Sequence, residues 1–190
     1  MRQRWVDSGE GDASDAEVVA RVRSGDREAY RLLVRRHQDL LFRHALRLTG
    51  DADLAADLTQ GALVKAYAHL GRCRDPERFG AWVFRILANA CKDHLKSRRR
   101  RDVSLDDQRG VDVEADADPA LDLERARLGQ ALNDALRRLA APLREAFVLK
   151  HVEGRSYEEM GQMLRLSVPA LKMRVHRARE ALKVMLEEVL

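Results

Sequence analysis

The stretch that decides the fold lies near the carboxyl end, where residues 154–180 read GRSYEEMGQMLRLSVPALKMRVHRARE. Ser156 and Glu159 have the spacing of a capping box, in which the serine hydroxyl and the glutamate carboxylate satisfy free backbone amides at a helix start. A second start signal follows at Ser167, with Pro169 in the first turn of the next helix. A short capped helix, a tight turn and a longer capped helix together predict a helix-turn-helix.

The longer of these two helices has two unlike faces. At about 100° per residue, Leu171, Val175 and Ala178 fall on one side and predict a buried face. The opposite side carries Lys, His and Arg donors, which suit the guanine acceptors and phosphates of a DNA major groove. A solvated basic helix without a ligand is the alternative. The residues predicted to face DNA are Pro169, Lys172, Met173, His176 and Arg177, with Lys150 and Tyr157 as candidate phosphate contacts.

The amino-terminal half contains further helical patterns. A short helix is expected over residues 15–24, and a longer one over residues 26–49 ends at Gly50, which tolerates a left-handed cap. A helix starting at Asp51 or Asp53 would bury a stripe of apolar residues. The next helix is expected to start at Asp75-Pro76, with Asp75 as its N-cap. The stripe of the middle helix is Leu54, Leu58, Ala62, Ala66 and Leu70.

The last helix of this half changes character along its length. Its first part has an apolar stripe, but it continues past Ala90 and ends in four arginines at residues 98–101. A cationic helix end can neutralise nucleic-acid phosphates, although it also complements the helix dipole. Nearby aromatic rings could stack on an unpaired base, and two of them, Phe79 and Trp82, sit on the core stripe. The other candidate rings are Tyr67 and Phe84.

The composition predicts an all-α chain and excludes several classes of protein. Among 190 residues there are only 11 Gly and 4 Pro, and helix-forming Leu, Ala, Arg and Glu dominate. No apolar run approaches the roughly 20 residues of a spanning helix, and no secretory signal is visible. We therefore expect a cytoplasmic protein without membrane insertion. Cys73 and Cys91 are too few for a disulfide framework, and no catalytic set, metal spacing or phosphate loop is visible, so neither enzyme activity nor a cofactor is expected.

Charge divides the chain into two domains and a linker. Residues 21–101 carry 19 basic and 9 acidic side chains, and residues 125–190 carry 13 and 8. Residues 102–124 between them carry 1 and 9, a composition typical of disordered or extended segments. We therefore predict two small helical domains, residues 15–101 and 121–190, joined by a flexible acidic linker at 102–120. Residues 1–14 are expected to be a disordered tail.

These residues resemble a known family. Residues 143–150, 153–160, 167–172 and 176–180 resemble region 4 of the extracytoplasmic-function (ECF, group 4) bacterial sigma factors of the sigma-70 family. Asp57-Leu58-Thr59-Gln60 resembles the polymerase-binding helix of their region 2, and residues 79–86 followed by Asn89 resemble its promoter-melting segment. Gly61, Gly161 and Met173 depart from the family pattern. The two regions occur in the family's order, with no region 3 domain between them.

The resemblance implies a role in promoter-specific transcription initiation. Its expected partners are core RNA polymerase, through the β′ clamp helices and the β flap, together with promoter DNA and an anti-sigma factor. Region 4 would read the minus-thirty-five element through the DNA-facing residues named above. Asp57, Leu58, Gln60 and Val64 would dock on the clamp helices. The minus-ten element would be bound by Lys65, Asn89, Lys92, Asp93, Arg98 and Arg99.

Two other kinds of protein remain to be distinguished from a sigma factor. A stand-alone helix-turn-helix regulator would explain residues 142–186 but leaves the polymerase-binding signature and the basic helix end without a purpose. An interaction protein whose bundles bind a partner helix would explain the amphipathic stripes but not the cationic face.

Overall fold

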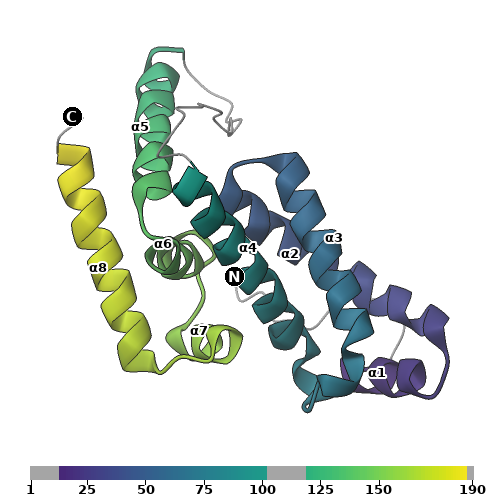
Figure 1. Ribbon diagram of the computed structural model, residues 1–190. Coiled ribbons are helices and arrows are strands. Elements are labelled where there is room, and N and C mark those ends of the chain that lie inside the picture. The colour runs from purple at the N-terminus through teal and green to yellow at the C-terminus, as the bar shows by residue number, and fades with distance from the viewer. Residues whose placement is uncertain (1–12, 102–118, 188–190) are drawn as a thin grey trace. The chain divides into compact units, whose positions relative to one another are not determined.

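The computed structural model describes residues 13–101 and 119–187, and every regular element within those ranges is helical (Figure 1). The prediction of an all-α chain is therefore confirmed. The chain divides into two compact units, Met1–Cys91 and Lys92–Leu190. Of the expected acidic linker, residues 102–118 lie outside the described residues, as do residues 1–12 of the expected tail.

Four α-helices build the first unit, and the last of them continues past its end (Figure 1). Gly50 ends the second helix in the left-handed conformation with φ of 70°, as the sequence predicted, and the Asp51 carboxylate caps the third by accepting from the Leu54 amide at 3.0 Å. Helices α2 and α3 lie side by side. The helices are α1 (Asp15–Arg23), α2 (Tyr30–Thr49), α3 (Ala52–Ala68) and α4 (Phe79–Arg101).

The core of this unit contains more than the predicted apolar stripes. Phe84, one of the candidate base-stacking rings, is fully buried, and its ring centroid lies 4.5 Å from that of His44. His44 is fully buried and His37 is 4% exposed, so both histidines belong to the core. Helix α4 buries Phe84 because it presents two adjacent rows of apolar side chains to its neighbours. The prediction of Phe84 as a base-stacking ring is therefore wrong.

Two local predictions in this unit differ from the structure. Ala62, Ala66 and Leu70 are buried as the stripe predicted. At the start of α3, however, Leu54 and Leu58 are only half-buried, whereas Ala55 and Thr59 are buried. The prediction is wrong only for the first two residues of the stripe, because small side chains there take the buried positions and do not stand out in a hydrophobic pattern. Asp75 makes no side-chain cap; it pairs with Arg78 at 3.2 Å, and a short 3₁₀ turn at Pro76–Arg78 precedes α4.

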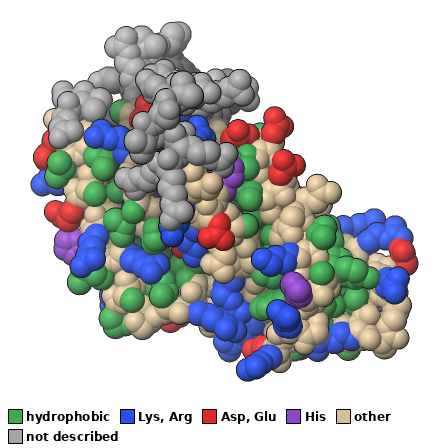
Figure 2. Space-filling model, in the orientation of Figure 1, with side chains coloured by type: hydrophobic (Ala, Val, Ile, Leu, Met, Phe, Trp, Pro, Cys, Tyr) green, Lys and Arg blue, Asp and Glu red, His purple; other side chains and the backbone are tan. Residues whose placement is uncertain are grey.

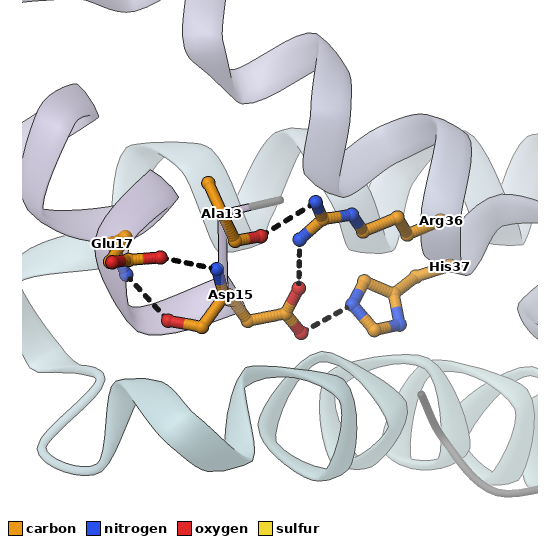
Figure 3. A network of polar contacts seen from close by, with 6 residues as sticks. Ala13, Asp15, Glu17, Arg36 and His37 are labelled. Atoms are coloured by element: carbon orange, nitrogen blue, oxygen red, sulfur yellow. Dashed lines mark hydrogen bonds and ion pairs between the residues drawn. The ribbon is translucent and has the colours of Figure 1, made fainter. Parts of the chain in front are cut away.

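A partly buried polar network joins α1 to α2 (Figure 3). The Asp15 carboxylate accepts from Arg36 Nη1 at 3.1 Å and lies 2.7 Å from His37 Nε2, and Arg36 Nη2 donates to the Ala13 carbonyl at 2.7 Å. Burial raises the pKa of Asp15, but the hydrogen bonds and charges of His37 and Arg36 outweigh it and leave that pKa below its ordinary value. The network fixes α1 against the bundle through residues more than twenty positions apart.

Arg23, in the last turn of α1, makes a second long-range contact. Its guanidinium donates to the carbonyls of Leu70 and Cys73 at 2.8 and 2.6 Å, which lie just beyond the end of α3. Leu70 begins the short 3₁₀ turn Leu70–Arg72, and its carbonyl also accepts from the Cys73 amide at 3.1 Å, so Arg23 links α1 to this turn. Helix α1 is therefore held at both ends.

The second unit consists of four α-helices and a π-helical segment within the described range. Helices α5, α6 and α7 all pack against α8. The shared apolar cluster includes Leu139 from the end of α5 and Ala178 and Leu182 from α8, with Leu143 and Phe147 packed beside them. The elements are α5 (Pro119–Arg138), α6 (Ala141–Phe147), the π-helix Val148–Val152, α7 (Tyr157–Leu164) and α8 (Val168–Glu187).

Candidate nucleic-acid and polymerase interfaces

Helices α7 and α8 form the predicted helix-turn-helix. The Glu159 amide donates to the Ser156 hydroxyl at 3.1 Å, and the Ser156 amide donates to the Glu159 carboxylate at 2.7 Å, so the capping box is confirmed. Arg165 ends α7 in the left-handed conformation with φ of 54°. A Cβ atom on Gly161 would lie 3.1 Å from the Leu166 carbonyl oxygen, so the turn folds back closely against α7 at a residue without a side chain.

The orientation of α8 agrees with the helical-wheel prediction. Leu171, Val175 and Ala178 are buried, with exposures of 0, 4 and 0%. The opposite face projects into solvent and is backed by this rigid apolar row. His176 lies on that face with its Nδ1 4.0 Å from the Glu180 carboxylate. The exposed residues of the face are Pro169, Lys172, Met173, His176 and Arg177.

Two further candidates converge with Lys172 although they come from other elements. Lys150 lies in the π-helix and Tyr157 is the first residue of α7. The Lys150 ammonium nitrogen lies 4.7 Å from the centre of the Tyr157 ring, and the Lys172 nitrogen lies 5.8 Å from it. These are distances of cation–π contacts. The three residues thus form one basic and aromatic cluster beside the exposed face of α8.

The π-helix that carries Lys150 also carries a histidine, His151. Partial burial lowers the pKa of His151, and the charges of Arg179 and Lys150 lower it further. The lowered pKa favours the neutral form of His151, and the positive charge of the cluster itself is that of Lys150 and Lys172. Lys and Arg side chains are also seen over both units on the face drawn in Figure 2.

The polymerase-binding candidates divide between two sides of α3. Asp57, Gln60 and Val64 are exposed and follow helical spacing along one face, with Val64 61% exposed. Leu58 is half-buried and faces away from them. The structure therefore brings three of the four candidates together on one surface.

A groove of about 700 Å³ runs beside this surface, between α2 and α3. Gln60 and Val64 form part of its α3 wall. Tyr30 and Tyr67 approach within 4.9 Å between ring centroids, and the Tyr30 hydroxyl donates to the Leu63 carbonyl at 2.7 Å. Burial raises the pKa of this Tyr30 phenol far above its ordinary value, so the hydroxyl stays a donor.

The other wall of the groove was missed by the sequence analysis. It is formed by α2, and its members include Val34 and Phe42, which lie eight residues apart and therefore on one helix face. Both are half-buried, and their spacing is the signal that could have revealed a second apolar stripe on α2. The α2 residues lining the groove are Tyr30, Arg31, Val34, Gln38, Asp39 and Phe42.

The minus-ten candidates lie on two helices. Lys65 is exposed on α3, whereas Asn89, Lys92 and Asp93 share one side of α4 by their spacing. Asn89 and Asp93 are exposed and Lys92 is half-buried. Further along α4, Arg98 is exposed, and the side chain of Arg99 lies outside the described residues.

Among the aromatic candidates for base stacking, Tyr67 alone has an exposed ring in the described part of the chain, at 39%. Phe79 is fully buried in contact with His37, and Trp82 is half-buried. The expectation that Phe79 belongs to the core is confirmed.

Three further features bear on the class of protein. Within residues 13–101 and 119–187, no cluster of three or more His, Cys, Asp or Glu side chains is arranged to hold a metal ion. None of the described helices is long and apolar enough to span a bilayer. Cys73 and Cys91 are buried and are not joined in a disulfide, and desolvation raises the pKa of Cys73.

Comparison with known proteins identifies both units. Residues 33–101 match the family described as Sigma-70 region 2, and residues 129–182 match Sigma-70, region 4. The chain is 33% identical over 187 residues to the RNA polymerase sigma-H factor of Pseudomonas aeruginosa, covering 93% of this chain and 95% of that protein. It is 30% identical over 177 residues to the ECF RNA polymerase sigma-E factor of Escherichia coli K12, covering 89% and 92%.

Solved structures give the same result. CnrH in complex with the cytosolic domain of CnrY is 29% identical and matches with a TM-score of 0.62 over 93% of this chain and 99% of CnrH. The sigma factor RpoE of Bartonella quintana, bound to the anti-sigma factor NepR, is 29% identical with a TM-score of 0.58, covering 83% and 96%. The protein is thus a transcription initiation factor. It belongs to the ECF group of the RNA polymerase sigma-70 family.

Proposed function

We propose that this sigma factor binds core RNA polymerase and directs it to promoters by reading the minus-thirty-five element with α8 and capturing the melted minus-ten strand with α3 and α4. The main support is the exposed face of α8, where Lys172, His176 and Arg177 project from a helix backed by buried Leu171 and Val175. Cationic donors on a rigid helix at the second position of a helix-turn-helix are suited to major-groove recognition.

The groove beside the proposed polymerase-binding surface has a second wall, which is formed by α2. Asp57, Gln60 and Val64 remain the proposed docking residues on the clamp helices, and Leu58 is proposed to support them from the half-buried side of α3. The adjoining groove offers apolar surface from Val34 and Phe42. A partner helix lying there would remove this apolar surface from water, which favours association.

Capture of the minus-ten strand is proposed for Lys65 and for the polar side of α4. Unstacking bases costs a few kcal/mol, which contacts to flipped bases and polymerase binding would offset. The exposed Tyr67 ring, on the same helix as Lys65, supplies a surface on which a base could stack. The α4 residues proposed for this role are Asn89, Lys92, Asp93, Arg98 and Arg99.

An anti-sigma factor is the proposed regulator. The support is the similarity to RpoE of Bartonella quintana, whose structure contains the anti-sigma factor NepR. Affinity purification of the tagged chain from its native host should recover a further protein besides polymerase. Recovery of polymerase alone under every growth condition would contradict the proposal.

Run-off transcription tests the function directly. The purified chain with core polymerase should start promoter-dependent transcripts from a template selected by the holoenzyme, and core polymerase alone should not. A stand-alone helix-turn-helix regulator would bind duplex DNA but start no transcripts. In the active holoenzyme, Lys172→Ala or Arg177→Ala should weaken binding to the upstream element by about 1–3 kcal/mol, and unchanged affinity would remove that residue from the site.

A further inference from the structure

Tyr157 occupies an unusual position between two cations. Its ring centre lies 4.7 Å from the ammonium nitrogen of Lys150 and 5.8 Å from that of Lys172. The two lysines come from different elements, the π-helix before α7 and the recognition helix α8. Both lysine head groups therefore share a single aromatic ring.

Holding two lysines ready to bind an anion has two costs in free energy. Two ammonium groups near each other repel, and each long lysine side chain loses rotamer freedom when it is held in place. An aromatic face carries negative electrostatic potential and attracts both cations. The ring therefore offsets part of the repulsion and restrains both head groups before any ligand arrives.

The ring itself is held on a rigid support. Tyr157 follows Ser156 directly, and the capping box between Ser156 and Glu159 fixes the first turn of α7. Lys150 is also anchored by the backbone, because its ammonium group donates to the Arg155 carbonyl at 3.3 Å. Tyr157 and Lys150 are both half-buried, whereas Lys172 is exposed. The cluster thus presents a positioned pair of cations to solvent.

We propose that Tyr157 is a positioning residue for DNA binding: its ring holds Lys150 and Lys172 as a pair that contacts backbone phosphates, and its hydroxyl is not required. The inference rests on the proposed function of α8 as a reader of duplex DNA. It assigns to the pair a sequence-independent part of that binding, since phosphate contacts position a protein without specifying bases. Lys172 thereby changes from a proposed base reader to a phosphate contact, and base reading on α8 is left to His176 and Arg177.

The first experiment measures binding of the full-length chain to a short random-sequence DNA duplex by fluorescence anisotropy at several salt concentrations. Tyr157→Phe keeps the ring and should bind like the parent. Tyr157→Leu keeps apolar volume without the ring and should bind several-fold more weakly, with a shallower dependence on salt. The double variant Lys150→Ala/Lys172→Ala should lower the slope of log affinity against log salt by about 0.9 for each phosphate that is no longer neutralised.

The decisive variant combines both changes. If Tyr157 acts through the lysines, adding Tyr157→Leu to Lys150→Ala/Lys172→Ala should weaken binding no further. A further loss of affinity in this background would overturn the inference, because the tyrosine would then touch DNA itself. A loss in Tyr157→Phe equal to that in Tyr157→Leu would overturn it as well, since the hydroxyl would be the active group.

A measurement without DNA tests the geometry separately. The methylene protons next to the ammonium groups of Lys150 and Lys172 should be shifted upfield by the ring in proton NMR spectra of the parent and of Tyr157→Phe, and not in Tyr157→Leu. Absence of the shift in the parent overturns the positioning role alone. If the shift is present but neither the chain nor its holoenzyme with core polymerase binds duplex DNA, the proposed function of α8 fails and the phosphate contact fails with it.

Discussion

The hydrogen bonds described for the two units of this sigma factor differ in reach. In the first unit, several of those that join one helix to another element connect distant residues: Asp15 with His37, Tyr30 with Leu63, and Arg23 with Cys73. In the second unit, the contacts beside the site are local, such as Ser156 with Glu159 and Lys150 with Arg155. Local contacts depend on spacing in the sequence, whereas distant ones depend on how whole helices pack.

Because distant contacts tie the helices of the first unit together, we expect one core substitution to lower the stability of that whole unit. Phe84→Ala would remove a fully buried ring that packs on His44, and the reduced burial together with the cavity should destabilise the first unit by about 3–5 kcal/mol. Hydrogen exchange should speed up for the amides of α2 and α4, and those of α7 and α8 should keep their protection. The exposed ring at Tyr67, changed to Ala, is the control and should cost far less. Equal loss of protection in both units would show that their stabilities are not separate.

The long-range network at α1 should give a pH-dependent effect. Asp15→Asn removes a carboxylate that accepts hydrogen bonds from Arg36 and His37, and it should cost about 1–3 kcal/mol at pH 7. The pKa of Asp15 is lowered in the folded state, so its stabilising contribution is present above the unfolded pKa near 4 and is lost as pH falls through the folded pKa. Guanidinium unfolding should therefore show parent and variant converging in strongly acidic solution.

Asp53→Asn is the matched control for that change. Asp53 also lies in the first turn of a helix, but its side chain is exposed. Its substitution should change the unfolding free energy by less than about 0.5 kcal/mol at any pH. A cost for Asp15→Asn that stays constant down to acid pH would contradict the role of the carboxylate charge.

Removing one local contact of the second unit should cost less free energy of unfolding than the Phe84 and Asp15 substitutions in the first unit. Ser156→Ala removes one half of the capping box of α7 and should destabilise the second unit by about 1 kcal/mol, measured by thermal unfolding. Ser156→Thr keeps the hydroxyl and should retain most of the stability. If the threonine variant loses as much as alanine, the hydrogen bond to the Glu159 amide is not the source of the effect.

The smallest expected effects come from two helical glycines, one in each unit. Gly61 on α3 is exposed, and a Cβ atom added there would meet only open space, so Gly61→Ala should stabilise the first unit by about 0.5–1 kcal/mol. Gly161→Ala should give no such gain, because its Cβ would lie 3.1 Å from the Leu166 carbonyl oxygen. Thermal unfolding of both variants measures the two changes in stability. Equal gains in stability would mean that the turn after α7 moves to accommodate the added Cβ atom.

The sequence alone determined the helical class of the fold, the helix-turn-helix and the orientation of α8. Those features follow from caps, turns and a 3.6-residue repeat, all of which act over a few residues. Lys172, His176 and Arg177 could be placed on the exposed face because Leu171 and Val175 mark the buried one so clearly.

The tertiary structure was needed to show that Ala55 and Thr59 take the buried positions at the start of α3, that His37 and His44 lie in the core, and that α2 supplies a second wall to the groove. It also decided that Lys150 and Lys172 meet over one ring. Each of these depends on the approach of separate helices, where small side chains and long-range hydrogen bonds select among packings that a hydrophobic pattern leaves equally favourable.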